Sequence, residues 1–342
     1  MLYSILRWLM PSLGVTVLML FSWFNSPEAL ALASPQCPTG MTLIPGGTFR
    51  MGANDHYPDE LAVEAVTVDS FCMNKYEITN AQFAQFVKET GYVTIAERPI
   101  PKDQYPDLTD EQRSPGSLVF EPPPEGTEIN QVGYMSWWHW TPGASWQHPA
   151  GPNSNLEGKE NYPVVHIAYK DAEAYAQWAK KSLPSEAQWE FAARGKLKNR
   201  VFGWGNTYSP KKANTWQGEF PIKNTQADGY IGPAPVGSFP PNGYGLYDTT
   251  GNVWEWTLDW YRPGHPGMAH QVNPIVAQAE QSFDPREPGV AKHVIKGGSY
   301  LCSRNYCTRY RPAAREALEP DTGMAHLGFR LVTNPTDTRT LN

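Results

Sequence analysis

Three segments of the chain carry apolar residues at the spacing of an amphipathic helix. The first predicted helix begins after Thr79, which can form a capping box with Gln82, and it ends at Gly91. The third begins at a similar box formed by Ser185 and Gln188. The pattern predicts short helices that each pack one face on a core. The buried faces carry Phe83, Phe86 and Val87 in the first helix and Ala172, Tyr175, Trp178 and Ala179 in the second.

Short alternating or apolar stretches predict strands towards both ends of the chain. Elsewhere, residues 96–160 and 200–300 are rich in Pro, Gly and Trp and show little periodicity, so they are interpreted as long ordered loops. No internal repeat or low-complexity tract is present. The predicted strands lie in 41–52, as a pair around a Pro-Gly-Gly turn, in 66–72, 293–295 and 327–332.

The composition fits a loop-rich globular chain. Among 342 residues, 18% are charged, Pro and Gly contribute 32 and 29 residues, and there are 13 Trp and 17 Tyr. So many aromatic residues exclude a disordered chain. A net charge of −6 excludes an extended basic surface for nucleic acid. The local cluster Arg304, Arg309, Arg311 and Arg315 is interpreted as stacked or salt-bridged.

The first 33 residues have the features of an export segment. Arg7 precedes an apolar run over 8–24, and Ala31-Leu32-Ala33 forms a small-residue cleavage pattern. A cleaved signal peptide over 1–33 is favoured. The alternative is an uncleaved membrane anchor, although the run is at the short end for crossing a bilayer. Either reading places the remaining chain in the periplasm or outside the cell, with 8–24 as the only membrane contact.

Export changes the interpretation of the four cysteines. In an oxidising compartment an even set of cysteines is normally bridged, so Cys37 and Cys72 are predicted to form a disulfide. This bond would tie the start of the mature chain to its first hairpin. One folded domain is expected to span 37–335, followed by a flexible tail over 336–342.

The other two cysteines, Cys302 and Cys307, stand five residues apart in a run rich in Tyr and Arg. On a helix their side chains would lie about 140° apart. On a strand they would lie on opposite faces, roughly 16 Å apart. A shared role therefore needs a bent segment, with the preceding strand turning at Gly297-Gly298.

Two adjacent thiols could serve as a zinc site, a disulfide or a site for a soft monovalent metal. Zinc is disfavoured because the chain has no second closely spaced cysteine pair, and none of four candidate histidines has ligand spacing. Spacing alone does not choose between the other two roles. The four histidines are His265, His270, His293 and His326.

Two loops rich in oxygen donors are candidate calcium sites. Asn214 and Asp228 bracket one of them, and Asp248 and Glu255 bracket the other. Calcium takes six to eight oxygens from carboxylates, amides and backbone carbonyls, which irregular loops can supply. Ordinary side-chain hydrogen bonding within turns is the alternative.

Taken together, several motifs resemble the formylglycine-generating enzyme family, the oxidases that mature sulfatases. The resemblance runs from about Cys37 to Val332. Most of its motifs indicate only the superfamily fold, whereas Cys302-x4-Cys307 within Gly-Gly-Ser-Tyr…Tyr-Cys-x-Arg-Tyr-Arg is typical of the true oxidases. The fold-level motifs are Ile-Pro-Gly-Gly-Thr-Phe-Arg-Met-Gly at 44–52, Tyr-Glu-Ile-Thr-Asn at 76–80, Pro-Val-Val-His at 163–166, Leu-Pro-Ser-Glu-Ala-Gln-Trp-Glu at 183–190, Gly-Asn-Val-Trp-Glu-Trp at 251–256 and Leu-Gly-Phe-Arg at 327–330.

The resemblance implies an irregular, C-type-lectin-like α+β fold with little regular secondary structure. It implies that Cys302 and Cys307 hold Cu(I), with Ser299, Tyr306 and Trp254 lining the pocket. The expected substrate is an unfolded sulfatase segment of the form Cys-x-Pro-x-Arg, whose cysteine is oxidised to formylglycine. Dioxygen and a thiol or other reductant are the expected co-substrates, and the protein is expected to be a monomer. The alternative is a non-catalytic binding or activation module in which the two cysteines form a plain disulfide.

The resemblance also implies two structural calcium ions. Asn214, Asp228 and the backbone oxygens of Thr215 and Tyr230 would hold the first. The second would be held by Asp248, Glu255 and the carbonyls of Gly251 and Val253, with Asp248 in place of a more usual Asn.

The chain departs from the family at a few positions. Two disulfides of vertebrate members are replaced by Ala176 with Leu331 and by Ala193 with Pro312. Cys72 stands where many members have an aromatic residue. His326 stands where vertebrate members have an Asn near the substrate groove, so it bears on substrate selection.

Overall fold

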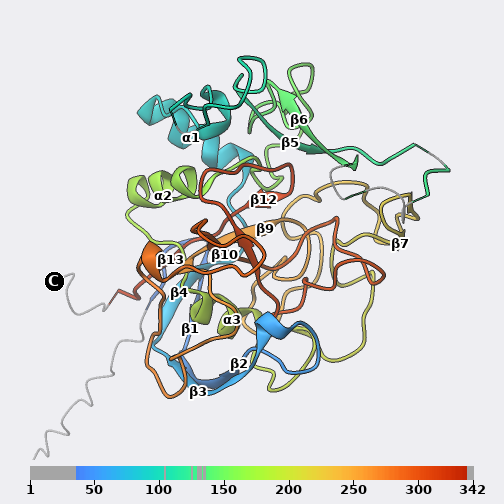
Figure 1. Cartoon of the computed structure of the whole chain (residues 1–342). Coiled ribbons are helices and arrows are strands. Elements are labelled where there is room, and N and C mark those ends of the chain that lie inside the picture. The colour runs from blue at the N-terminus through green and yellow to red at the C-terminus, as the bar shows by residue number, and fades with distance from the viewer. Residues whose placement is uncertain (1–35, 104, 125, 129–132, 134–135, 337–342) are drawn as a thin grey trace, which may run out of the picture.

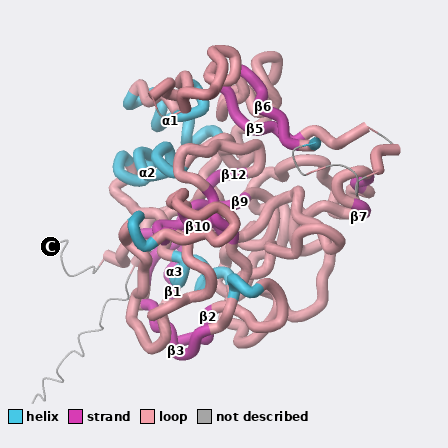
Figure 2. The backbone as a smooth tube through the Cα atoms, viewed as in Figure 1, coloured by secondary structure: helices cyan, strands magenta, loops and turns pink. Residues whose placement is uncertain are grey.

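In the computed structural model, residues 36–103, 105–124, 126–128, 133 and 136–336 are described. The predicted N-terminal signal or anchor over 1–33, and all but the first residue of the predicted tail over 336–342, lie outside these residues. Loops and turns make up most of the backbone (Figure 2). The helices are α1 (Asn80–Thr90), α2 (Tyr169–Trp178) and α3 (Glu186–Ala193), with 3-10 turns η1 (Pro58–Glu60), η2 (Ile95–Glu97) and η5 (Ala279–Gln281).

The strands are short and belong to several small sheets. One sheet has the order β11-β10-β9-β12, a second the order β1-β4-β13, and three further pairs are β2-β3, β5-β6 and β7-β8. The strands are β1 (Met41–Ile44), β2 (Gly47–Met51), β3 (Val63–Val68), β4 (Phe71–Asn74), β5 (Gly116–Phe120), β6 (Trp138–Pro142), β7 (Gly218–Glu219), β8 (Lys223–Asn224), β9 (Trp254–Trp260), β10 (His293–Lys296), β11 (Glu316–Leu318), β12 (Leu327–Gly328) and β13 (Val332–Thr333).

The four-stranded sheet lies near the centre of the molecule and leads into the segment with the two free cysteines (Figure 1). β10 runs antiparallel to β9, and β12 runs parallel to β9 with Leu327 opposite Trp254. The predicted turn after β10 is present at Gly297 and Gly298. Gly298 has φ +68°, and a Cβ there would lie 2.7 Å from Tyr310 Cα, so only glycine fits.

Two predicted strands are wrong in extent, and β9 is one of several strands that were not predicted. The stretch 66–72 is split between β3 and β4. The Asp69 N–H, between the two strands, donates a hydrogen bond to Asn273 Oδ1 (2.8 Å), and the chain passes here from one sheet to another. The stretch 327–332 is likewise split into β12 and the start of β13. β9 was missed because most of its residues are buried, so it shows no alternation.

The predicted disulfide is confirmed. Cys37 and Cys72 are bonded, with their Cα atoms 5.6 Å apart. Cys72 is fully buried within β4, the middle strand of its sheet, rather than at the end of a longer strand. Next to this bond, Gln36 and Thr336 pair through their backbones, so both ends of the described chain lie side by side.

The predicted limits of α1 are confirmed. Thr79 and Gln82 form the capping box, and Gly91 adopts the left-handed conformation that ends the helix. α1 and α2 pack through aromatic rings, with Phe83 stacked on Tyr175 at 5.8 Å between ring centroids. The main core joins these helices to β9 and β12, and it includes Cys302.

Residues 96–160 form a largely irregular region that contains the hairpin β5–β6, which the sequence did not predict (Figure 1). Trp137 and Trp146 are buried in this region, whereas Trp140 is 38% exposed. The residues in place of the vertebrate disulfides are all buried. Ala176 and Leu331 share the main core, so this part of the core is filled by packing.

The ring of one buried histidine on β10, His293, is packed between aromatic rings. The His293 ring stacks on Tyr169 at 3.6 Å between centroids and packs against Trp260 at 3.8 Å, with the planes tilted by 31°. Neither ring nitrogen has a hydrogen bond of good geometry. Burial lowers the pKa of His293 from 6.5 to about 4, and the nearby backbone of Leu258 and Asp259 offsets only part of this effect. The folded protein therefore holds His293 in its neutral form.

We expect His293→Phe to stabilise the protein, by about 1 kcal/mol at pH 7, because a ring of similar shape replaces two unsatisfied nitrogens. The gain should grow in acid. Between pH 6.5 and about 4 the unfolded chain binds a proton at His293 that the folded protein does not, so the stability of the wild type falls as pH falls through this window. The His293→Phe protein does not lose stability in this way, because phenylalanine does not bind a proton. Denaturant unfolding at pH 7 and pH 5 measures both effects.

His139, which is exposed on β6, provides the matched control. The His139→Phe protein should unfold like the wild type at both pH values. A His293→Phe protein less stable than the wild type at pH 5 would show that the His293 nitrogens are satisfied in solution.

Candidate functional site

The two free cysteines are brought together by a bent segment, as predicted. Their sulfurs are 3.0 Å apart, well beyond the roughly 2.05 Å of a disulfide. The bend is closed by backbone hydrogen bonds from Cys302 N to Ser299 O (2.9 Å) and from Cys307 N to Ser303 O (3.0 Å). The pair does not lie in a plain surface turn, because Cys302 is only 3% exposed and belongs to the main core, whereas Cys307 is half-buried.

The two thiols differ in acidity. Burial raises the pKa of Cys302 well above the ordinary thiol value, and its contact with Cys307 raises it further. The hydrogen bond from Cys302 lowers the pKa of Cys307, and the adjacent Arg309 adds to this effect. The geometry thus favours a thiol at Cys302 that donates to a thiolate at Cys307.

Tyr57, from a segment far away in sequence, braces the turn beside Cys307. The Tyr57 hydroxyl accepts hydrogen bonds from the backbone N–H of Thr308 (3.2 Å) and from its side-chain hydroxyl (3.3 Å). Thr308 directly follows Cys307, so these bonds limit how far the second sulfur can move.

Tyr57 and the acidic residues that follow it also contact the arginines after Cys307. Asp59 pairs with Arg309 (2.8 Å), and Glu60 pairs with Arg311 (2.6 Å). Both guanidinium groups lie over the Tyr57 ring, at 4.0 and 5.7 Å. The expectation that this arginine cluster is stacked and salt-bridged is confirmed. The other two members are Arg304, over the Tyr208 ring (5.5 Å), and Arg315, paired with Glu186 (2.7 Å).

Two of the three other predicted pocket residues are buried beside the thiols. Ser299 Oγ lies 2.9 Å from His326 Nδ1 and accepts a hydrogen bond from Leu301 N (3.2 Å). Trp254 begins β9 and packs in the same core cluster as Cys302. Its backbone N–H donates to the His326 carbonyl (2.8 Å).

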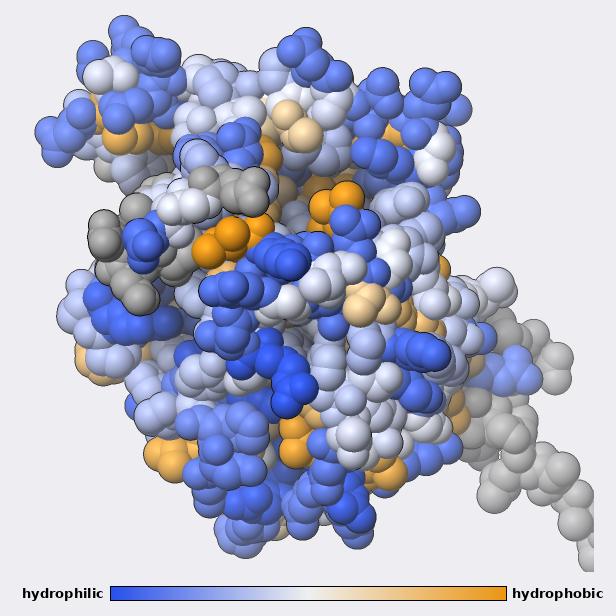
Figure 3. Space-filling view, turned by 90° about the vertical axis from the view of Figure 1, so that its right-hand side faces the viewer, coloured by the Kyte–Doolittle hydropathy of each residue, from blue (hydrophilic) through white to orange (hydrophobic). Residues whose placement is uncertain are grey.

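The third predicted residue, Tyr306, is 52% exposed and belongs to an aromatic wall. Its ring stacks on Phe220 at 4.6 Å and meets the edge of Trp137 at 6.0 Å. Phe220 links β7 to β8, and the face that carries β7 is hollowed below the β5–β6 region, with hydrophobic side chains gathered in the hollow (Figure 3). Tyr306 thus offers an accessible aromatic surface one residue before Cys307.

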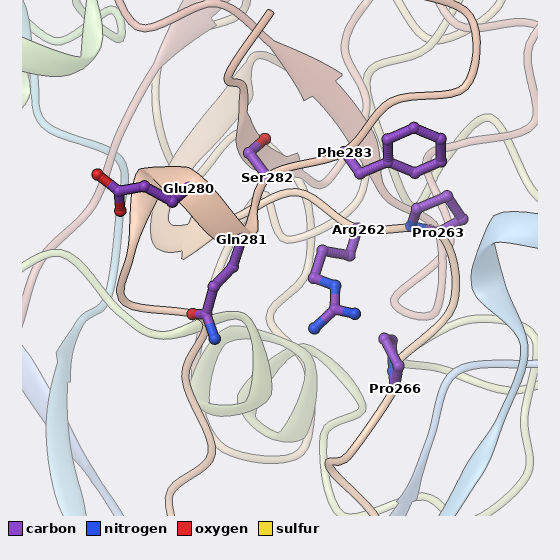
Figure 4. A pocket seen from close by; sticks show the side chains of 7 residues that line it. All are labelled: Arg262, Pro263, Pro266, Glu280, Gln281, Ser282 and Phe283. Atoms are coloured by element: carbon purple, nitrogen blue, oxygen red, sulfur yellow. The ribbon is translucent and has the colours of Figure 1, made fainter. Parts of the chain in front are cut away.

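Two cavities differ in their relation to this site. A cavity of about 310 Å³ is lined by Arg304, Thr308 and Tyr310 of the segment that carries the thiols. A cavity of about 590 Å³ is lined by none of the residues around the two thiols (Figure 4). Only the first can extend a binding surface from the thiol pair. The lining of the second is Arg262, Pro263, Pro266, Glu280, Gln281, Ser282 and Phe283.

The first predicted calcium loop brings Asp228 against the backbones of Thr215, which follows Asn214, and Tyr230. The Asp228 carboxylate accepts the backbone N–H groups of Thr215 and Tyr230, each at 3.1 Å, and burial raises its pKa. Both N–H bonds of the buried Asn214 amide are used, to Gly232 O (3.0 Å) and to another Asn side chain (3.1 Å). Asn214 Oδ1 is therefore the atom left to face a cation.

The second predicted calcium loop is an acidic centre with one cation. Arg330 pairs with Glu255 through two hydrogen bonds of 2.6 and 2.8 Å. Glu77 lies close by and accepts from the backbone N–H of Val253 (3.3 Å), between Gly251 and Glu255. Burial raises the pKa of Glu77 well above its ordinary value, and the charges of Asp248 and Glu255 raise it further. Three buried carboxylates thus face one guanidinium, which favours an additional cation.

Sequence reasoning gave no role to Asn252, which links the two loops. Its Oδ1 lies 3.1 Å from Asn214 Nδ2, and its Nδ2 donates to Glu77 (2.8 Å). Asn252, Glu77 and Arg330 each occur in a motif quoted above, but their partners lie far apart in sequence. In the described part of the chain no three His, Cys, Asp or Glu side chains converge as a ready ligand set, so both loops would also need amide and carbonyl oxygens.

Comparisons with known proteins identify the family of this chain. Residues 28–335 match the family model described as the Sulfatase-modifying factor enzyme 1-like domain. The Formylglycine-generating enzyme of Mycobacterium tuberculosis is 44% identical over 303 residues, which are 87% of this chain and 98% of that protein. The chain belongs to the formylglycine-generating enzyme family.

The family also contains a relative named Inactive C-alpha-formylglycine-generating enzyme 2, from Mus musculus. It is 36% identical over 329 residues, which are 94% of each protein. Among solved structures, PvdO from Pseudomonas aeruginosa shares the fold with a TM-score of 0.58 and 24% identity over 85% of this chain and 93% of that one. The predicted irregular α+β fold of the formylglycine-generating enzyme family is therefore confirmed.

Proposed function

We propose that this chain converts a cysteine in a Cys-x-Pro-x-Arg segment of an unfolded sulfatase to formylglycine. The observation that carries the proposal is the pair of free sulfurs 3.0 Å apart, in a chain 44% identical to a protein named for this activity. The inactive relative keeps the fold as well, so the fold alone does not assign the reaction. The proposal therefore depends on the two free thiols, whose sulfurs can bind a metal.

The electron balance of this reaction requires an oxidant and a reductant. Conversion of the substrate CH2–SH to a thioaldehyde releases two electrons and two protons, and hydrolysis then gives the aldehyde and hydrogen sulfide. Reduction of dioxygen to water takes four electrons, so two more must come from a reductant such as two small-molecule thiols, which leave as a disulfide. Side chains alone seldom activate dioxygen, which points to a redox metal.

The thiol pair fits Cu(I) as that metal. Thiolates are soft donors that select Cu(I) over hard cations, and both sulfurs are unbonded and close enough to share one ion. When bound, copper would supply the redox chemistry that protein side chains lack. Cys302 and Cys307 would be its ligands, and the hydrogen bond from Cys302 lowers the pKa of Cys307 from its ordinary value, which favours the thiolate form.

The surrounding residues would bind and shield the substrate. Tyr306 and the aromatic wall provide an exposed surface for an extended peptide, whose proline can pack on aromatic rings. Trp254 and the core around Cys302 exclude water from the buried side of the pair. Ser299 donates or accepts hydrogen bonds beside the Cys302 sulfur.

The test is formylglycine formation from a synthetic Cys-x-Pro-x-Arg peptide, in the presence of Cu(I), dioxygen and a thiol. Mass spectrometry should detect the aldehyde only when all three are present. Absence of product, with the peptide bound, would favour the alternative of a non-catalytic binding module. Loss of product without copper, followed by recovery on its addition, would support copper as the cofactor.

We also infer two structural calcium ions, one in each acidic loop. Chelation with EGTA should lower the melting temperature by about 5 °C or more, because an ion that binds only the folded state stabilises it by mass action. The Asp228→Asn protein, which keeps an oxygen near the Thr215 and Tyr230 N–H groups, should melt lower than the wild type and respond less to EGTA. Calorimetry measures both effects.

Magnesium provides the control for calcium, since it prefers fewer protein ligands and should not restore the melting temperature after chelation. A melting curve that does not change under EGTA would count against both sites.

The protein is also proposed to be exported from the cytoplasm. The Cys37–Cys72 disulfide fits an oxidising compartment, in agreement with the signal or anchor expected over 1–33. In the part of the chain that the structure describes, no helix is long and apolar enough to cross a membrane.

A further inference from the structure

His326 is a buried side chain between Ser299 and Trp138, and Trp138 packs against the cluster that contains Trp137 and Phe220 of the aromatic wall. It directly precedes β12 and is 8% exposed. Its ring packs on Trp138 at 4.7 Å between centroids, with the planes tilted by 59°. On its other side, Nδ1 lies 2.9 Å from Ser299 Oγ. The ring is thus fixed by packing while one nitrogen meets a single hydroxyl.

The hydroxyl of Ser299 has one proton and more than one possible acceptor. Its oxygen already accepts from Leu301 N (3.2 Å), and the Cys302 N–H donates to the Ser299 carbonyl (2.9 Å) in the same turn. The Ser299 side chain also lowers the pKa of Cys302, so its hydroxyl lies within reach of that sulfur. If His326 Nδ1 carries no proton, it accepts the Ser299 proton, and the sulfur receives none. If Nδ1 carries a proton, it donates to Ser299 Oγ, and the Ser299 proton is free to point at Cys302.

We propose that His326 is a positioning residue whose Nδ1–H turns the Ser299 hydroxyl towards Cys302, so that the Cys302 thiolate accepts a hydrogen bond when the pair binds Cu(I). The inference rests on the proposed copper site. Metal binding removes the Cys302 proton to solvent, and the resulting thiolate then needs a donor on its buried side. Hydrogen bonds to ligand sulfurs stabilise their charge and tune the metal that they hold.

His326 acts here as a neutral ring. Burial lowers the pKa of His326 to about 3, so at pH 7 the ring is one of two neutral tautomers rather than a cation or a general base. The tautomer then sets the direction of the Ser299 hydroxyl. An amide side chain also offers an N–H donor, so Asn at this position can serve the same purpose, whereas an apolar ring cannot.

The experiment measures Cu(I) affinity by competition with a chromophoric chelator, on the full chain, for the wild type and four variants. His326→Phe keeps the ring packed on Trp138, Ser299→Ala removes the hydroxyl, the third variant combines both changes, and His326→Asn is the conservative replacement. We expect each single loss to weaken Cu(I) binding by about tenfold. The double variant should be no weaker than either single, and His326→Asn should stay within about threefold of the wild type.

Nitrogen NMR of labelled histidines gives a second readout, which packing alone would not move. His326 should carry its proton on Nδ1 in the Cu(I)-loaded protein. A proton on Nε2, additive losses in the double variant, or wild-type affinity in both His326→Phe and Ser299→Ala would overturn the inference. If His326→Phe does not fold, Ser299→Ala and the NMR result still decide it. Absence of Cu(I) binding by the wild type would instead overturn the copper proposal with it.

Discussion

Replacing Cys307 with serine is expected to abolish formylglycine production, and replacing Cys302 is expected to do the same. A hydroxyl is a hard and weakly acidic donor, so it does not replace a thiolate on Cu(I). The loss of activity should exceed about 100-fold. Losing a residue that only hydrogen-bonds a metal ligand costs at most about that much, and here the ligand itself is lost. Turnover of a Cys-x-Pro-x-Arg peptide, followed by mass spectrometry, measures the effect.

The two variants should differ in stability although they share the loss of activity. Cys302 is 3% exposed and packs in the main core, so Cys302→Ser buries a hydroxyl and should cost about 1–3 kcal/mol. Cys307 is half-buried, which makes Cys307→Ser the cleaner test of function.

Ser303 supplies a control from the same turn. Its hydroxyl donates to Asn305 Oδ1 (2.8 Å) and does not take part in the thiol pair, so Ser303→Ala should keep activity within a few-fold of the wild type. A Cys307→Ser protein that still makes formylglycine at the wild-type rate would falsify the thiol pair as the reaction centre.

The features that the sequence predicted well are decided by nearby residues. The limits of α1 follow from Thr79, Gln82 and Gly91, each of which acts within one turn of the helix. The bend between Cys302 and Cys307 was likewise predictable, because neither regular structure brings residues five apart together. Local geometry therefore located both the helix and the candidate site.

The features that the sequence did not predict depend on distant partners. β9 contains Glu255 and Asp259, two fully buried acids that read as surface residues in a sequence. Arg330 neutralises the first, and the backbone N–H of Glu186 donates to the second at 2.6 Å. Both partners lie about 75 residues away in the sequence, so the local sequence of β9 does not show that the strand is buried.

The candidate site shows the same division. Cys302, Cys307 and Ser299 lie in one segment and were found together. The roles of Tyr57 and Asn252 were missed because the first braces Thr308 from 251 positions away, and the second contacts Glu77 from 175 positions away. Single-sequence reasoning finds donors that share a loop, whereas the residues that hold the loop in place come from the fold.

Removal of the Cys37–Cys72 disulfide is the change expected to cost the most stability. The bond closes a loop with a sequence separation of 35. In the chain-entropy model such a loop contributes about 3–4 kcal/mol, which is a large share of a typical net stability. Cys37→Ala should therefore lower the free energy of unfolding by roughly this amount, measured by urea denaturation of protein prepared under oxidising conditions.

A reducing agent provides the matched comparison for this prediction. It should destabilise the wild type by a similar amount and leave the Cys37→Ala protein unchanged, because the other two cysteines, Cys302 and Cys307, are already free. The bond also keeps the Cys37 and Cys72 thiols from exchanging with the reactive pair. Mass spectrometry of a non-reduced tryptic digest should recover a peptide that joins Cys37 to Cys72. Recovery of both cysteines as free thiols from exported protein, or a cross-link from Cys72 to Cys302, would contradict the pairing. Equal urea midpoints for the wild type and Cys37→Ala would show that the bond contributes nothing to stability.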